Sequence, residues 1–110
     1  MNGLKISTLE ARHTRTTNPM AHRVEVGGKV VCYTGDGEYT DALGELVADA
    51  DLVVAECYFY DKPVNWHLNY PDIHRLNAKR VVLTHMSANM LAQTENVGEE
   101  SAYDGYVVTV

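Results

Sequence analysis

The sequence predicts a layered α/β protein. Three β-compatible runs come first, at residues 5–11, 21–26 and 29–34. Two apolar, strand-like runs follow at 51–58 and 80–84, and segments with helical features precede each of them. This alternation of helix with buried strand is typical of a sheet that has helices packed against it. The chain of 110 residues has room for one small domain and is too short for two.

The second and third runs form a predicted hairpin. Residues 21–26 (AHRVEV) alternate cleanly, and Gly27-Gly28 then turns the chain into residues 29–34 (KVVCYT). Two β runs joined by Gly-Gly indicate a hairpin, because glycine reaches the positive φ angles that tight hairpin turns need. The third run ends in a tight, glycine-flanked loop that contains Asp36.

A helix is predicted from about residue 41 to residue 48. Thr40 is a suitable N-cap and Asp41 lies in the first turn. Residues 51–58 (DLVVAECY) are then almost continuously apolar, as expected of a strand covered on both faces.

The remaining predicted elements are short. Helices are expected at 70–76 and 87–93, and strands at 80–84 and 106–110. Pro71 is compatible with the first of these helices because the first turn of a helix needs no backbone donor there.

The charge of the chain limits its partners. The formal net charge is −6, with 15 acidic against 9 basic side chains, and the longest basic cluster is Lys79-Arg80. Such a surface repels a phosphate backbone unless bound cations compensate, so the composition argues against a nucleic-acid-binding domain. No apolar run approaches the length of a membrane span. Cys32 and Cys57 lie within apolar runs, which indicates buried thiols in a reducing compartment; we expect a cytoplasmic protein.

Three residues with metal-binding side chains follow directly on β runs. His13 follows the first run, Asp36 the third, and His85 the run at 80–84. Each alone is more often a turn or core residue than a ligand. Together they offer two imidazoles and a carboxylate at strand ends, which can converge on one rim of a sheet. Zinc accepts this set of ligands readily.

The order of these motifs resembles a known family. The motifs are Tyr33-Thr34-Gly35-Asp36, Thr40-Asp41-Ala42-Leu43, residues 51–58, His67, Leu83-Thr84-His85-Met86-Ser87 and the late Ala102-Tyr103-Asp104-Gly105. In this order they resemble the second half of metallo-β-lactamase-fold hydrolases, and most of all the branch of ribonuclease Z/BN and related phosphodiesterases. The resemblance implies the C-terminal half of an αββα sandwich, a mixed sheet with its helices on one face.

The resemblance also implies roles for individual residues. His13 matches the lone histidine ligand of the family, Asp36 the aspartate that bridges two metals, and His85 the last histidine ligand. Glu56 and His67 resemble a pair near the leaving group, in which the histidine is the general acid. Two zinc ions are expected per complete site, with manganese or iron as alternatives.

One motif of the family is absent from the chain. The HxHxDH signature, which provides most ligands of the first metal, occurs nowhere in the 110 residues. The chain thus resembles one half of a domain cut in the middle. Its sheet face, rich in Val, Leu, Ile and Cys, would be exposed unless a separate N-terminal half or a second copy covered it.

Several functions follow from the resemblance. A complete enzyme would hydrolyse a phosphodiester with a metal-activated hydroxide. The short segment between His13 and Asp36 leaves no room for an RNA-gripping arm, which argues against a dedicated tRNA nuclease and favours a small phosphodiester. An ester or lactone substrate is an alternative. The isolated chain is expected to be inactive, as a fragment or as a half-domain that needs a partner; a third possibility is an unrelated binding module. His22 and His74 are given no role, and Trp66 is expected to pack over its loop.

Overall fold

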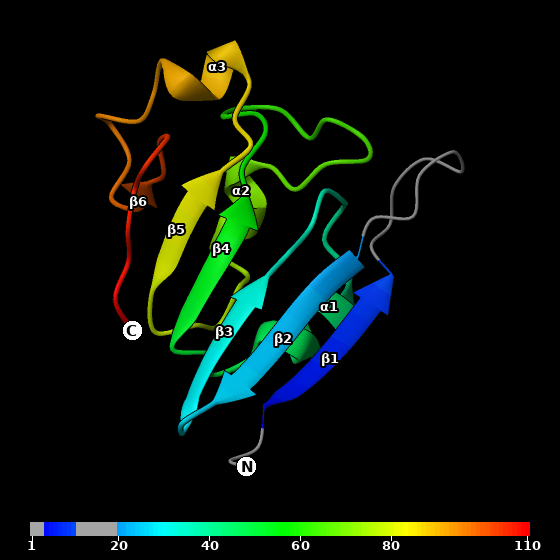
Figure 1. Cartoon of the computed structure of the whole chain (residues 1–110). Helices are drawn as coiled ribbons and strands as arrows, with labels where there is room; N and C mark the ends of the chain where they lie inside the picture. The colour runs from blue at the N-terminus through cyan, green and yellow to red at the C-terminus, as the bar shows by residue number, and fades with distance from the viewer. Residues whose placement is uncertain (1–3, 11–19) are drawn as a thin grey trace.

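The computed structural model describes residues 4–10 and 20–110, and it confirms the predicted α/β class with a mixed sheet. Six strands lie in chain order across one sheet (Figure 1). The strands are β1 (Lys5–Glu10), β2 (Met20–Val26), β3 (Lys29–Tyr33), β4 (Leu52–Glu56), β5 (Val81–Thr84) and β6 (Glu100–Ser101). The first three pair antiparallel and the rest pair parallel. The helices are α1 (Asp41–Val47), α2 (Tyr70–Ile73) and α3 (Ala88–Leu91).

The predicted hairpin and helix starts are confirmed. Gly27 and Gly28 both have positive φ and close the turn between β2 and β3, where Val26 pairs with Lys29. The Thr40 side chain accepts a hydrogen bond from the Leu43 N–H at 3.0 Å and caps α1. The two later helices are shorter than predicted. In α2 the chain continues beyond Ile73 with N–H groups that donate three residues back, which tightens the turn and ends the α-helix.

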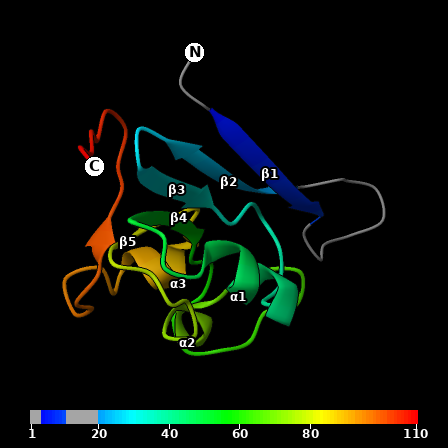
Figure 2. The same cartoon turned by 90° about the horizontal axis from the view of Figure 1, so that it is seen from below.

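One face of the sheet packs against the helices. Figure 2 shows α1 and α2 together on the same side of the strands. The side chains on that side are in register across the strands, with Cys32 beside Val53 and Ala55 beside Leu83, and all four are buried. Cys32 and Cys57 are buried free thiols, as predicted, and burial raises the pKa of both, that of Cys57 to about 12.

The opposite face of the sheet is open over β1 to β3. We call the side chains of Ile6, Val24, Val26, Val31 and Tyr33 the open sheet face; pairing of the strands in register places them on the same side. Ile6 is 57% exposed, Val26 48% and Tyr33 38%. The predicted exposure of an apolar face is therefore confirmed, except that the two cysteines do not belong to it.

The predicted final strand at 106–110 is wrong. The strand that follows β5 is Glu100–Ser101, which pairs parallel with Val82 and Leu83, and the Ala102 N–H then donates to the Leu83 carbonyl. The free edge of β5 is thus already occupied before residue 106. The tail is held instead through Glu100, whose carboxylate accepts from the Arg80 guanidinium at 2.8 Å and from the Tyr106 hydroxyl. These contacts lower the pKa of Glu100 to about 2, with Arg80 the largest cause.

No helix in the two described ranges is long and apolar enough to cross a bilayer.

Gly35 is required where β3 ends. Its φ is +66°, and a Cβ added there would lie 2.6 Å from the backbone oxygen of Met20. We therefore expect Gly35→Ala to lower the free energy of unfolding by about 2 kcal/mol, because it combines backbone strain with a collision against main chain. Gly98→Ala is the control, since nothing lies within 4 Å of a Cβ at Gly98. Equal stability of the two variants in urea unfolding would contradict this account of the turn.

Candidate metal centre

The site is built around the buried carboxylate of Glu56. Glu56 is the last residue of β4 and is fully buried, with an exposed fraction of 0%. Its Oε1 atom accepts a backbone hydrogen bond from Gly37 at 3.0 Å and another from Leu68 at 2.8 Å. Its own backbone N–H donates to the hydroxyl of Thr34 at 3.0 Å. The carboxylate therefore joins the loop after β3 to the loop that precedes α2.

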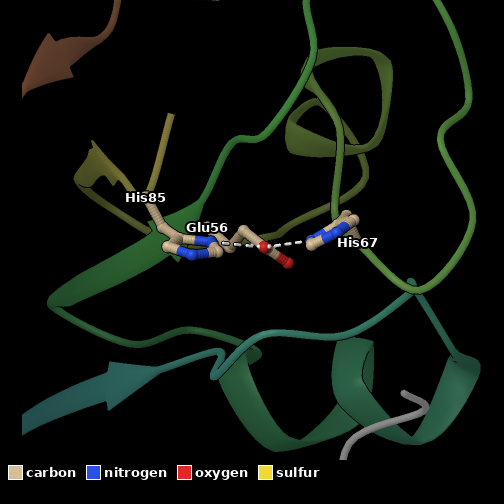
Figure 3. Close-up of side chains that lie close together, drawn as sticks. All are labelled: Glu56, His67 and His85. Atoms are coloured by element: carbon tan, nitrogen blue, oxygen red, sulfur yellow. Dashed lines mark hydrogen bonds and ion pairs between the residues drawn. The ribbon is translucent and has the colours of Figure 1, made fainter. Parts of the chain in front are cut away.

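The second oxygen of Glu56 contacts two imidazoles. Oε2 lies 2.7 Å from Nδ1 of His67 and 2.7 Å from Nδ1 of His85, and Figure 3 shows the carboxylate between the two rings. The ring of Tyr58 stacks on that of His67, with centroids 3.9 Å apart and planes 11° apart. His67 is therefore held at Nδ1 by a charge and on one face by an aromatic ring.

Local backbone geometry brings the histidines to Glu56. His85 follows β5 directly and has a φ of +51°, which is uncommon for a residue other than glycine and is more frequent at functional sites. His67 follows Trp66, whose φ is +69°. Two backbone bonds hold the loops in place: the Tyr58 N–H donates to Leu68, and the Ser87 N–H donates to the carbonyl of Tyr58.

These contacts fix the state of each neutral imidazole. A carboxylate accepts hydrogen bonds, so each Nδ1 must carry the hydrogen that it shares with Oε2. The Nε2 atom of each ring then keeps its lone pair. A histidine oriented through one nitrogen by a carboxylate, with the other nitrogen free to bind a cation, is the usual arrangement at metal sites.

Asp36 lies beside this group. Its Oδ1 atom is buried and is 3.4 Å from Nδ1 of His85. Within the described part of the chain this oxygen has no hydrogen-bond partner. Its contact is the ion pair with His85, and a bound cation would give this buried oxygen a closer partner. Burial, and then the charges of Asp36 and Glu56, raise the pKa of the neighbouring Tyr33.

The described residues contain a group that fits a metal ion. Glu56, His67 and His85 each offer one ligand atom, and these atoms all lie within 4.8 Å of one another. The carboxylate of Glu56 already accepts four hydrogen bonds, and its 2.7 Å contacts are hydrogen-bond lengths, so we assign it the orienting role and not that of a ligand. Imidazole nitrogen and the unpartnered oxygen of Asp36 form a donor set that suits zinc.

The structure brings together four of the five residues singled out from the sequence. Asp36 lies beside His85, and Glu56 contacts His67. The fifth, His13, lies outside the described residues.

Sequence reasoning missed two features of the site. It did not foresee that Glu56 binds both histidines, nor that Tyr58 stacks on His67. The apolar run at 51–58 did contain a signal for the first, because a carboxylate inside a buried strand must find partners. Trp66, which was expected to pack over its loop, is 42% exposed, and its backbone N–H donates to Glu38 at 2.8 Å.

Comparison with known proteins identifies the family. Residues 1–86 match the β-lactamase superfamily domain, and the chain therefore belongs to the metallo-β-lactamase superfamily. Over 93 residues it is 33% identical to a zinc phosphodiesterase ELAC protein 2 homolog of Caenorhabditis elegans, covering 76% of this chain and 11% of that protein. Over 82 residues it is 33% identical to the probable metallo-hydrolase YhfI of Bacillus subtilis, covering 66% of this chain and 34% of that one.

Solved structures agree with this assignment. The crystal structure of YhfI superposes with a TM-score of 0.71 at 25% identity, covering 89% of this chain and 45% of YhfI. The crystal structure of human tRNase Z, short form, gives a TM-score of 0.72 at 22% identity; the match covers 96% of this chain and 43% of that one. Zinc-bound PqqB from Methylobacterium extorquens gives 0.67 at 14% identity, with 97% and 50% covered. The last two show the fold alone. The chain spans at most half the length of these proteins.

The tautomers of the two site histidines can be measured directly. In long-range ¹H–¹⁵N NMR spectra at a pH where the rings are neutral, we expect Nδ1 of His67 and His85 to be protonated and Nε2 to be bare, because both Nδ1 atoms donate to Glu56. His74, which is exposed at the end of α2, serves as the internal control. Glu56→Gln should disturb both site histidines and leave His74 unchanged. Protonation at Nε2 in either site ring would contradict the proposed orientation.

Proposed function

We propose that this chain contributes the second half of a two-metal hydrolase centre, and that the complete centre hydrolyses a phosphodiester. The observation that carries the proposal is the buried Oδ1 atom of Asp36, which makes no hydrogen bond and lies next to an imidazole that Glu56 orients. Membership of a hydrolase superfamily and similarity to a zinc phosphodiesterase support it.

Asp36 and His85 would hold the metal, with Nε2 of His85 as the nitrogen ligand. His13, which lies outside the described residues, is the third proposed ligand. Zinc is the expected ion, with manganese or iron as alternatives. When bound, zinc would supply a Lewis acid and lower the pKa of a coordinated water to about 7.

Glu56 and His67 would handle the proton of the leaving group. When both nitrogens of His67 carry hydrogen, Nδ1–H donates to Glu56 and Nε2–H can be given to the departing oxygen. The carboxylate stabilises the charged imidazolium at a contact of 2.7 Å. Tyr58 keeps the ring plane fixed, which limits the directions in which Nε2 can point. Asp36 would also take part in catalysis, by binding the cations.

A small phosphodiester is the substrate that we favour over tRNA. The β2–β3 hairpin occupies most of the interval between His13 and Asp36, and the chain carries a net charge of −6. Both features argue against a dedicated arm for RNA. An ester or lactone is the second candidate, because a metal-activated water can attack the carbonyl carbon of an ester as well as the phosphorus of a phosphodiester.

We further propose that the open sheet face is covered by an N-terminal half-domain and that this chain alone is inactive. The solved relatives are about twice as long as the region that matches, which supports a missing half. Association with a second copy through the same face is the alternative. The buried free thiols of Cys32 and Cys57 support a cytoplasmic location.

Zinc binding tests the ligand assignment. The chain alone should bind zinc weakly, and Asp36→Ala should reduce the affinity by about tenfold or more, because it removes a ligand and not merely a charge. Asp61→Ala, at an exposed carboxylate, is the matched control. Zinc titration calorimetry after chelator treatment measures the effect. If Asp36→Ala binds zinc as the wild type does, the metal assignment is wrong.

Activity of the combined halves tests the half-domain proposal. The chain alone should not hydrolyse bis-p-nitrophenyl phosphate, whereas addition of a separately produced N-terminal half that carries the HxHxDH motif should give a metal-dependent rate. Ile6→Lys and Val24→Lys together should abolish this rescue, because they place charge on the open sheet face. Hydrolysis by the isolated chain at ordinary enzymatic rates would contradict the proposal.

A further inference from the structure

Thr34 connects the strand that carries Glu56 to the turn that carries Asp36. It directly follows β3 and is 1% exposed. Its backbone N–H donates to the carbonyl of Val54 at 3.1 Å, which extends the parallel pairing of β3 with β4 by one residue. Thr34 is therefore the last residue at which the chain of β3 still follows β4.

The hydroxyl of Thr34 takes the place of a main-chain acceptor. In a regular parallel pair, a residue whose N–H bonds to the neighbouring strand also uses its carbonyl toward that strand. The N–H of Glu56 would then donate to the Thr34 carbonyl. It donates instead to Oγ1 of Thr34 at 3.0 Å. The N–H of Glu56 is thus satisfied, while the main chain after Thr34 is free to turn away from β4.

The same hydroxyl holds the turn that follows. It donates to the carbonyl of Gly35 at 2.9 Å. Gly35 has a φ of +66°, and the backbone of Met20 leaves no room for a Cβ at that position. A hydroxyl has one donor and can also accept, and here both capacities are used within the protein. The residue directly before Asp36 is therefore fixed by one buried side chain.

Loss of this hydroxyl would leave two buried backbone groups without a partner. They are the N–H of Glu56 and the carbonyl of Gly35. A buried polar group without a partner is costly, so the chain would rearrange to satisfy them. The nearest replacement for the N–H is the carbonyl of residue 34, as in a regular parallel pair. That exchange would draw residue 35 toward β4 and move Asp36 away from its 3.4 Å contact with His85.

We propose that Thr34 is a positioning residue of the metal centre, and that its hydroxyl sets the place of Asp36 relative to Glu56 and His85. The inference rests on the proposed function, because Asp36 and His85 are the residues proposed to hold zinc. It deepens that function by making a hydroxyl that touches neither zinc nor substrate a requirement for zinc binding.

Two variants separate the hydroxyl of Thr34 from its volume. Thr34→Ser keeps the hydroxyl and loses the methyl group, whereas Thr34→Val replaces the hydroxyl by a methyl group. In zinc titration calorimetry on the whole chain, Thr34→Ser should bind zinc as the wild type does. Thr34→Val should bind about tenfold more weakly, the usual effect of losing a residue that orients a ligand. Urea unfolding gives the stability of each variant for comparison.

Two controls match these variants. Thr84 is the last residue of β5 and directly precedes His85, and its hydroxyl makes no hydrogen bond within the described ranges. Thr84→Val should therefore keep the zinc affinity of the wild type. Val47 is fully buried at the end of α1, so Val47→Ala should lower stability through a cavity and leave zinc affinity unchanged.

A crystal structure of Thr34→Val without metal gives a readout that does not depend on zinc. We expect the N–H of Glu56 to donate to the carbonyl of residue 34. We also expect Oδ1 of Asp36 to have left its 3.4 Å contact with Nδ1 of His85. An unchanged contact between Asp36 and His85 would overturn the inference.

The zinc results separate this inference from the proposed function. Zinc affinity that falls with stability alike in Thr34→Ser, Thr34→Val and Val47→Ala would overturn the positioning role. Wild-type affinity in Thr34→Val together with lost affinity in Asp36→Ala would overturn the inference and leave the metal assignment standing. Wild-type affinity in Asp36→Ala would overturn the metal assignment, and with it the role of Thr34 in the centre.

Discussion

A carboxylate removed from water must be matched by hydrogen-bond donors, and the described site is arranged around that requirement at Glu56. Its two oxygens accept from two backbone N–H groups and from two imidazoles. Removing one donor would leave a buried charge undercompensated, which costs several kcal/mol in typical proteins. The loop after β3, the loop before α2 and the end of β5 are therefore tied to one another through a single side chain.

This constraint also explains the chemistry that we propose. Glu56 accepts hydrogen bonds from Nδ1 of His67 and of His85. The Nε2 atoms of the two rings are therefore the ones that remain available to a proton or a cation. His67 and His85 would therefore differ in role because their surroundings differ. His85 lies beside the unpartnered oxygen of Asp36, whereas His67 borders a cleft with an arginine stacked on a tyrosine. One buried anion thus lies between the proposed metal ligands and this cleft.

The open sheet face fits the proposal that another half completes the site. The side of the sheet that packs on α1 and α2 has a well-buried core, and the other side exposes Ile6, Val26 and Tyr33 over β1 to β3. The crystal structure of YhfI is about twice as long as the region of it that this chain matches. The chain itself belongs to the metallo-β-lactamase superfamily. Exposed apolar surface of this kind is typical of a surface that another chain or segment covers. The proposed centre, with ligands on one half only, is consistent with that state.

The sequence by itself determined the α/β class, the hairpin at Gly27-Gly28, the capped start of α1 and the candidate residues Asp36 and His85. These features depend on local patterns, because glycine conformation, capping and apolar periodicity are properties of neighbouring residues. Only the tertiary structure decided that Glu56 contacts two histidines separated from each other by 18 positions, since loops of irregular backbone bring them together. It also decided that residues 106–110 form no strand, because Glu100 and Ser101 pair with the edge of β5 that a later strand would need.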